Sequence, residues 1–249
     1  MGLFNKKPAV VDPIALLKRG KSVEQCKAID YFYVGDQATA SATSKGCLKK
    51  VTVNITKKWD MADYLAYIQN KINSLNLKER AIAKIGLDES QISEIAPVAI
   101  HAFQRYDTPF KDSKSELRYR YEFDAEKETW SRVTNIYNVT WIFFSATQIY
   151  TYTYTFDALS NNAIETTRDF FYSDITCIRT EHEVEEKIDP KKVEGCFKKS
   201  EEWVHHDIHW DTLKIVVPGY EYSFTCTATP TLDQSIMAVK AMIREKKDA

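Results

Sequence analysis

The segment NVTWIFFSATQIYTYTYTFD, residues 138–157, indicates the fold class of this chain. Two runs rich in β-branched and aromatic residues flank a short polar break at residues 145–148, and this is the pattern of a β-hairpin. In the second run every other residue from Tyr150 to Phe156 is aromatic, and threonines stand between them. Because side chains alternate along a strand, we expect one aromatic face that packs inward or against a partner.

Further strands are expected on both sides of this hairpin, and one helix ends the chain. The strand candidates are residues 98–104, 117–123, 129–137, 168–184 with a turn at 173–174, 211–219 and 221–229. A capping box at Thr231–Gln234 opens the helix expected over residues 231–247. Its apolar residues recur at helical spacing, at Leu232, Ile236, Val239 and Ile243.

Residues 1–96 are expected to form a mixed, mainly helical region with a small β-hairpin. Asp12-Pro13 starts one helix, and a capping box at Ser22 and Gln25 starts a second. One apolar stripe over residues 61–75 predicts another helix, and residues 77–85 predict the next, ended by Gly86. The hairpin is expected from residues 29–34 and 48–56. We therefore expect two parts, residues 1–96 and 97–249.

Composition favours a folded cytoplasmic protein. The net charge is −1, which gives the whole molecule no electrostatic attraction for nucleic acid, although residues 1–58 carry an excess of seven positive charges. The five cysteines are widely spaced without a C-x-x-C pair and are expected to be reduced thiols. No apolar run suggests a signal peptide or approaches the ~18 residues of a membrane span.

Three stretches of the second part resemble bacterial members of the pleckstrin-homology-like superfamily. They are FFYSDITCI at residues 170–178, LKIVVPGYEYSFTC at 213–226 and SIMAVKAMIREKK at 235–247. The resemblance implies an α+β fold, in which an antiparallel barrel or curled sheet is closed by the C-terminal helix. It also implies a non-enzymatic interaction scaffold. The segment from Lys187 to Trp210 is longer and more charged than such a barrel needs.

The same resemblance suggests an anion-binding site. Some members of the superfamily bind phosphoinositides through a lysine near the first strand and a basic-x-Arg pattern on the second. The matching residues here are Lys111, Lys114, Arg118 and Arg120. Arginine side chains on one strand face can hold a phosphate by paired hydrogen bonds, whereas the simpler interpretation is two exposed arginines near Glu116 and Glu122.

The segment EEWVHHDIHWD, residues 201–211, suggests a metal site. As a strand, it would place His205, Asp207 and His209 on one face; as a helix, it would make His205 and His209 neighbours four residues apart. His182 is among the residues that could add a further ligand. A polar, solvated segment is the plain alternative.

The sequence contains no catalytic motif that indicates an enzymatic activity: it has no G-x-S-x-G, no Walker loop and no G-x-G-x-x-G. The first hypothesis is therefore a non-enzymatic cytoplasmic module, without a cofactor, that binds a protein or peptide partner by strand addition. The second is a membrane-surface adaptor for anionic headgroups, and the third is a metal-dependent enzyme centred on His205 and His209. A homo-oligomer is compatible with each of them.

Overall fold

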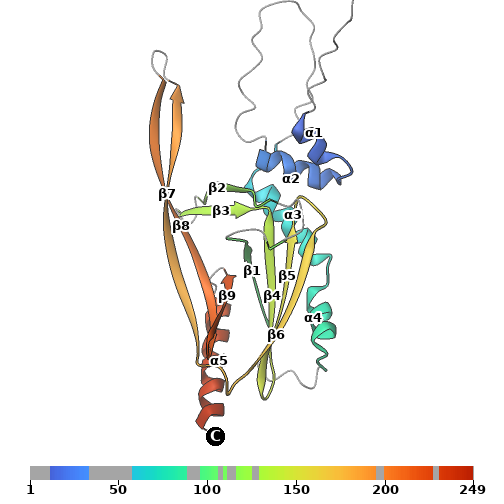
Figure 1. Ribbon diagram of the computed structural model, residues 1–249, viewed down its shortest axis with the longest axis vertical. Helices are drawn as coiled ribbons and strands as arrows, with labels where there is room; N and C mark the ends of the chain where they lie inside the picture. The colour runs from blue at the N-terminus through green and yellow to red at the C-terminus, as the bar shows by residue number, and fades with distance from the viewer. Residues whose placement is uncertain are drawn as a thin grey trace, which may run out of the picture.

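The computed structural model describes most of the chain. The described residues are 12–33, 58–88, 96–105, 109–110, 116–124, 129–194, 199–226 and 230–248. Figure 1 shows the arrangement: N-terminal helices lie against one side of a β-sheet, and a second sheet with the C-terminal helix lies on the other side.

In the part of the chain that the structure describes, nine strands form two sheets. Sheet A has the order β1-β4-β5-β6, and its neighbours are all antiparallel. Sheet B has the order β2-β3-β8-β7, and β9 also pairs with β8. The pairing of β3 with β8 is parallel and is limited to one residue pair, Trp130 and Ile208. The bounds are β1 Val98–Phe103, β2 Tyr119–Asp124, β3 Thr129–Thr134, β4 Ile136–Phe144, β5 Gln148–Asp157, β6 Ala163–Phe171, β7 Cys177–Glu194, β8 Lys199–Val217 and β9 Tyr220–Cys226.

Five helices complete the described chain, with bounds α1 Pro13–Lys18, α2 Val23–Tyr33, α3 Met61–Asn73, α4 Leu77–Ile85 and α5 Pro230–Asp248. Their ends follow the sequence. The Asp12 carboxylate accepts a hydrogen bond from the Ile14 N–H at the start of α1. Asp60 and Asp63 form a capping box at the start of α3. Gly86 ends α4 with a positive φ of 77°, a conformation that favours glycine because it has no Cβ.

The aromatic face of β5 is covered by the N-terminal helices. Tyr152, Tyr154 and Phe156 lie in one hydrophobic core with residues of α2, α3 and α4. At its centre, the Tyr64 ring on α3 stacks on Tyr31 of α2 with ring centroids 4.9 Å apart, and the Tyr64 side chain is fully buried. The expected aromatic face therefore packs inward, against helices of the same chain.

The opposite face of sheet A contributes to a second core. This core joins apolar residues of β1, β4, β5 and β6 to those of β7, β8 and β9. Ile236 and Ile243 of α5 are buried in it, so the C-terminal helix packs against the strands as expected. These two isoleucines share a helix face because they are seven residues apart.

A buried polar cluster holds the turn between β5 and β6 to the junction of β3 and β4. The Asp157 carboxylate accepts hydrogen bonds from the Asn135 side-chain amide at 2.8 Å, the Leu159 N–H at 2.9 Å and the Ser160 hydroxyl at 2.7 Å. Asp157 is 2% exposed. A buried carboxylate is costly without partners, and these three donors satisfy it.

The α+β class with antiparallel sheets is confirmed, whereas the described strands form two sheets and no closed barrel. The strand predicted at residues 29–34 is wrong over its described part, because Ile29 to Tyr33 belong to α2. The capping box at Ser22 and Gln25 starts that helix, and burial of Ile29 and Tyr31 stabilises it against their β-propensity. The hairpin partner expected at residues 48–56 lies outside the described residues.

The long charged segment between Lys187 and Trp210 forms much of a two-stranded ribbon. β7 and β8 pair continuously from Cys177 with Val216 to Glu194 with Lys199. Figure 1 shows one end of this ribbon projecting beyond the sheets. The core around Tyr64 uses residues from both sides of position 96, so the helices and sheet A share one hydrophobic core.

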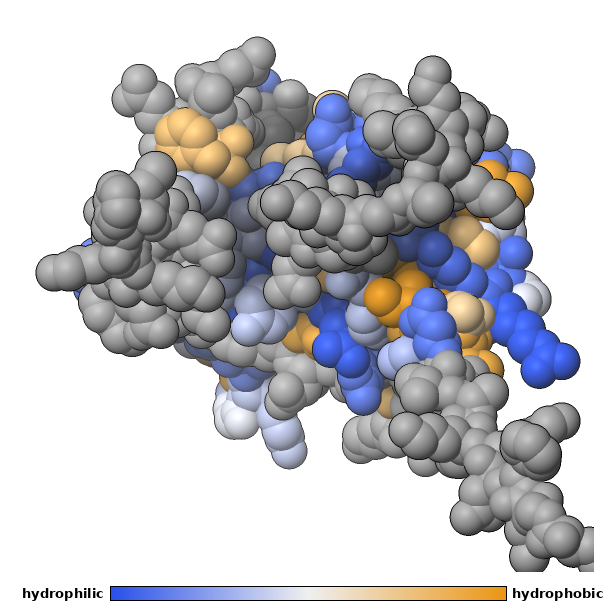
Figure 2. All heavy atoms as spheres, turned by 90° about the horizontal axis from the view of Figure 1, so that it is seen from above, coloured by the Kyte–Doolittle hydropathy of each residue, from blue (hydrophilic) through white to orange (hydrophobic). Residues whose placement is uncertain are grey.

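The face drawn in Figure 2 carries both polar and apolar groups. On the face drawn in Figure 2, apolar groups form separate small areas among polar ones, outside the grey atoms. Among the described helices, none combines the length and the apolar character that a membrane crossing requires.

The core around Tyr64 gives a stability prediction. Tyr64→Ala should lower the free energy of unfolding by about 3–5 kcal/mol, because it leaves a cavity among buried rings. Tyr64→Phe should cost about 1–2 kcal/mol, because the Thr134 carbonyl loses the hydroxyl that donates to it at 2.9 Å. Urea unfolding followed by circular dichroism measures both. Leu65→Ala is the control on the same helix, since Leu65 is 36% exposed, and equal losses for Leu65→Ala and Tyr64→Ala would contradict the packing.

Candidate functional site

β6 is the terminal strand of sheet A, and no strand among the described residues pairs with its outer edge. It pairs with β5 on one side only. Two hydrogen bonds at the ends of this pairing determine which residues of β6 are hydrogen-bonded to β5. They run from the Asp157 N–H to the Asn162 carbonyl and from the Tyr172 N–H to the Thr147 carbonyl. Since hydrogen-bonded pairs alternate in antiparallel sheets, Thr166, Arg168 and Phe170 bond to β5. The backbone groups of Thr167 and Asp169 therefore point outward.

A groove of about 600 Å³ runs along this edge, and we call it the edge groove. Five consecutive β6 residues, 167–171, line one wall, which is consistent with an accessible backbone edge. Val217, Pro218 and Tyr222 from the β8–β9 hairpin line the other wall. Phe171 at one end is 51% exposed, so the groove offers an apolar contact beside its polar edge.

Arg168 lies where the edge groove meets a second cavity. Its side chain lines both, and its guanidinium lies over the Tyr222 ring at 5.2 Å from the centroid. Among the residues that the structure describes, no carboxylate forms an ion pair with Arg168. Arg168 is also exposed. It is therefore a cation held in place by an aromatic ring, with its donors available to a ligand.

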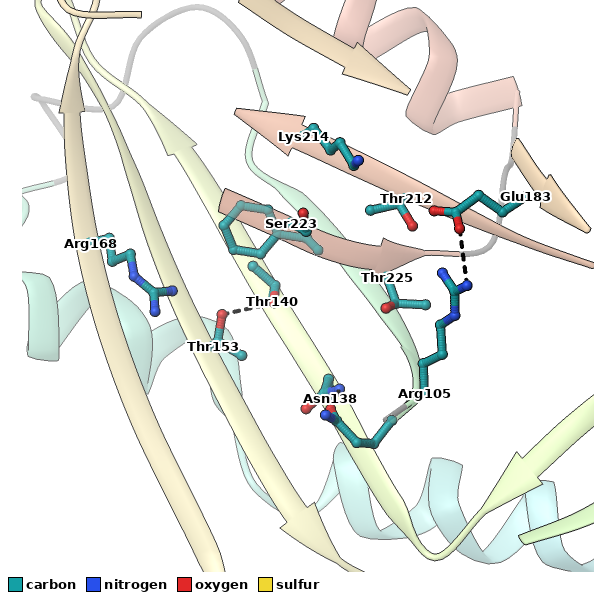
Figure 3. Close-up of a pocket in the computed structure, with 12 residues that line it drawn as sticks. Arg105, Asn138, Thr140, Thr153, Arg168, Glu183, Thr212, Lys214, Ser223 and Thr225 are labelled. Atoms are coloured by element: carbon teal, nitrogen blue, oxygen red, sulfur yellow. Dashed lines mark hydrogen bonds and ion pairs between the residues drawn. The ribbon is translucent and has the colours of Figure 1, made fainter. Parts of the chain in front are cut away.

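The second cavity is a polar cleft of about 470 Å³ between the sheets, which we call the inter-sheet cleft. Figure 3 shows its lining side chains projecting from strands of both sheets around the same space. Thr140 and Thr153, neighbours on β4 and β5, share a hydrogen bond of 2.9 Å on its floor. The lining residues are Gln104, Arg105, Asn138, Thr140, Thr153, Arg168, Glu183, Thr212, Lys214, Ser223, Phe224 and Thr225.

Two other cations of the inter-sheet cleft have carboxylate partners. Arg105 donates to the Glu183 carboxylate at 3.0 Å and stacks on the Trp210 ring at 3.3 Å from its centroid. The hydrogen bond from Arg105 lowers the pKa of Glu183. Lys214 lies between Glu181 at 2.5 Å and Glu221 at 2.9 Å, and hydrogen bonding to them raises the pKa of its ammonium group.

The predicted anion-binding residues lie on β2 and before it. Arg118 pairs with Glu116 and lies over the Tyr33 ring of α2 at 4.8 Å. Arg120 donates to the Tyr31 carbonyl at 2.6 Å and pairs with Glu122 at 3.1 Å. Both arginines therefore link β2 to α2 and to their own carboxylates. Lys111 and Lys114 lie outside the described residues, and headgroup binding at this set stays a prediction.

The predicted metal-binding residues lie on β8 and are extended, so the strand interpretation is the one observed. At about 3.3 Å per residue, His205 and His209 are roughly 13 Å apart along the strand. His205 instead contacts Glu186 across the ribbon at 2.6 Å, and His209 contacts His182 at 3.3 Å. The structure thus does not bring His205, Asp207 and His209 together. Within the described residues, no group of three or more histidine, cysteine, aspartate or glutamate side chains is placed to hold a metal ion.

The sequence predicted a strand from residue 168, but it did not identify the start of β6 at Ala163, its position at the sheet edge, a ligand-binding role for Arg168 or the inter-sheet cleft. The pattern AIETTRDFF at residues 163–171 carries charges at three positions, which is a common feature of edge strands. That signal could have identified an edge. The position of Arg168 beside Tyr222 depends on how the sheets meet, and no local pattern encodes it.

Comparisons with known proteins returned no relative. No protein-family model matches the chain, and neither the curated proteins nor the solved structures contain a significant match.

The contact between Arg105, Glu183 and Trp210 joins the end of β1 to the β7–β8 ribbon, which predicts local loosening when it is removed. Arg105→Ala should increase amide hydrogen exchange in residues 179–186 and 207–212 by about threefold or more, since stacking and the ion pair contribute about 0.5–2 kcal/mol together. Residues 137–144 should be unchanged. Arg105→Lys should be intermediate, because lysine keeps the charge without the planar fork. Mass-spectrometric exchange measures this, and equal loosening of sheet A would contradict it.

Proposed function

We propose that this protein is a non-enzymatic interaction module that binds an extended segment of a partner protein along the edge groove. The observation that supports this most strongly is the outward-facing backbone of Thr167 and Asp169 on a nine-residue terminal strand. An extended peptide satisfies such groups by forming the next strand of the sheet. These residues define the conformation of the bound partner segment, which is an extended strand.

The energetics favour a modest, reversible complex. Each main-chain hydrogen bond to the β6 edge contributes about 0.5–1.5 kcal/mol net. Contacts with Phe171, Tyr222 and Val217 add apolar area. Ordering the peptide and losing its translational freedom oppose these gains, so we expect a dissociation constant in roughly the micromolar range.

The positive charge of Arg168 should make the edge groove prefer a segment with an acidic residue. The side chains of Thr166, Arg168 and Phe170 point to the sheet B side of β6, because their directly opposed β5 partners include Thr153 and Ile149. A strand added next to β6 places one of its side chains beside Arg168 on that side. We expect an aspartate or glutamate there, since a carboxylate can accept paired hydrogen bonds from a guanidinium. Asp169 on the edge disfavours a second acidic residue beside it.

Membership of the pleckstrin-homology-like superfamily stays part of this proposal. Its support is the C-terminal helix, whose Ile236 and Ile243 lie in one hydrophobic core with residues of both sheets. The proposal uses a curled arrangement of two open sheets and does not need a closed barrel. Headgroup binding and metal-dependent catalysis remain alternatives with less support, because the arginines and histidines predicted for them contact other residues of the chain.

The open edge can be tested by removing one N–H group. Random twelve-residue peptides on a display library are selected against the full chain, and the enriched peptides are titrated against Thr167→Pro. Proline removes the outward donor and leaves the β5 ladder intact, so affinity should fall by about tenfold or more. Thr167→Val keeps the N–H and should bind within about twofold of the natural chain. Fluorescence anisotropy measures each affinity.

Circular dichroism and thermal unfolding of Thr167→Pro establish that the variant is folded, and Asp169→Pro serves as a second blocking variant at the next outward position. Enrichment of no peptide, or equal binding of the enriched peptides to both proline variants and the natural chain, rejects the proposal. Enrichment of peptides whose binding is lost only in variants of another surface rejects it equally.

The role of Arg168 gives a separate prediction. Arg168→Ala should weaken binding of acidic peptides by about fivefold to tenfold, because the charge-assisted hydrogen bonds contribute about 1–2 kcal/mol after solvent screening. Arg168→Lys should retain part of the affinity, and Arg168→Glu should reverse the preference for acidic peptides. Binding should also weaken at high salt. If peptides with an asparagine or glutamine in place of the acidic residue bind as tightly, Arg168 does not select charge.

A further inference from the structure

One face of the β7–β8 ribbon concentrates histidine and carboxylate side chains outside the edge groove. Directly opposed residues of an antiparallel pair share a face, and the pairs here are His182 with Asp211, Val184 with His209, and Glu186 with Asp207. His182 and His209 are therefore diagonal neighbours on this face. Both side chains are exposed, and His182 is 57% accessible.

The two imidazole rings lie close together, and each nitrogen of His182 faces a different group. His182 Nδ1 lies 2.9 Å from the Asp211 carboxylate, and its Nε2 lies 3.3 Å from His209 Nδ1. The rings are 5.5 Å apart between centroids, with an interplanar angle of 25°. Because Asp211 accepts a hydrogen bond from the His182 Nδ1–H, the lone pair of His182 remains on Nε2, the atom that faces His209.

The nitrogen separation matches that of two ligands on one metal ion, but the two nitrogens now point at each other, so each exposed ring must turn to direct its lone pair at the ion. Two nitrogens bound tetrahedrally at 2.0–2.1 Å from zinc are about 3.3–3.4 Å apart. A carboxylate on the far nitrogen of a ligating histidine fixes the ring and its tautomer in many metal sites, and Asp211 holds that position toward His182. Imidazole nitrogens favour zinc, copper and nickel over magnesium or calcium.

We propose that His182 and His209 form a two-histidine site for a divalent transition-metal ion of the zinc class, with Asp211 as a positioning residue. The ion is bound by His182 Nε2 and His209 Nδ1, and His209 takes its Nε2–H tautomer, its Nδ1 proton being exchanged through solvent water. Water completes the coordination of the ion, since the described residues offer no group of three ligands. This pairing differs from the sequence expectation, because its second histidine comes from β7 and not from His205 on β8.

His205 provides a matched control on the same ribbon face. It is 58% exposed and also contacts a carboxylate, Glu186, at 2.6 Å. However, among the described residues it contacts a carboxylate and no second imidazole. If zinc binds to the pair of imidazoles, substitution of His182 or His209 should weaken zinc binding and substitution of His205 should not. If zinc binds non-specifically to exposed histidines, all three substitutions should have similar effects.

The experiment is zinc titration of the full chain, prepared without a histidine tag, in competition with a chromophoric chelator. One zinc ion per chain should bind with a dissociation constant on the order of 10 µM. His182→Gln and His209→Gln should each weaken binding by about tenfold or more, and His205→Gln should leave it within about twofold. Asp211→Asn should weaken it by about tenfold, with the imidazole NMR signals of His182 still shifting on zinc addition.

Thermal unfolding without metal should be similar for the three histidine variants, because these side chains are exposed. The proposal is overturned if zinc does not bind at about 100 µM, if His205→Gln weakens binding as much as His182→Gln, or if both His182→Gln and His209→Gln retain full affinity.

Discussion

The structure depends on covering one aromatic face of sheet A. Tyr152, Tyr154 and Phe156 on β5 would expose a large apolar surface if the N-terminal helices were absent. The helices α2, α3 and α4 bury this surface, and the stacked rings of Tyr31 and Tyr64 form the centre of the contact. The Tyr64 hydroxyl also donates to the Thr134 carbonyl, so the helices are bound to sheet A by both packing and a buried hydrogen bond. Burial raises the pKa of Tyr64, which keeps this donor protonated at all ordinary pH values.

This constraint explains why the functional features lie on the other side and at the edge of sheet A. With one face committed to the helices, the opposite face is partly apolar toward α5 and partly polar, where Thr140 and Thr153 line the inter-sheet cleft. β6 is then a terminal strand on a sheet packed from both sides. A rigid edge lowers the entropic cost of binding an extended segment, because only the segment must be ordered. Arg168 stands beside that edge without a carboxylate partner among the described residues.

Local sequence signals predicted the elements well and their assembly poorly. The caps at Asp12 and Gly86 act within one turn, and the structure has helices that begin or end there. Alternating patterns likewise located β4, β5 and the β8–β9 hairpin. Ile29 to Tyr33 was misassigned because burial against Tyr64 outweighs strand propensity, and that contact joins residues far apart in sequence. The pairing of His182 with His209 and the position of Arg168 depend on strand register and on the meeting of two sheets. A short stretch of sequence determines neither of them.

The proposed binding mode requires β6 to be an open edge whose backbone groups are alternately hydrogen-bonded to β5 and available to a partner. Residue-resolved NMR hydrogen exchange of the full chain tests this directly. The amides of Thr166, Arg168 and Phe170 should be protected by their bonds to β5, and those of Thr167 and Asp169 should exchange much faster. Equal protection along the whole of β6 would mean that another segment or another copy of the chain already covers the edge, and would contradict the account.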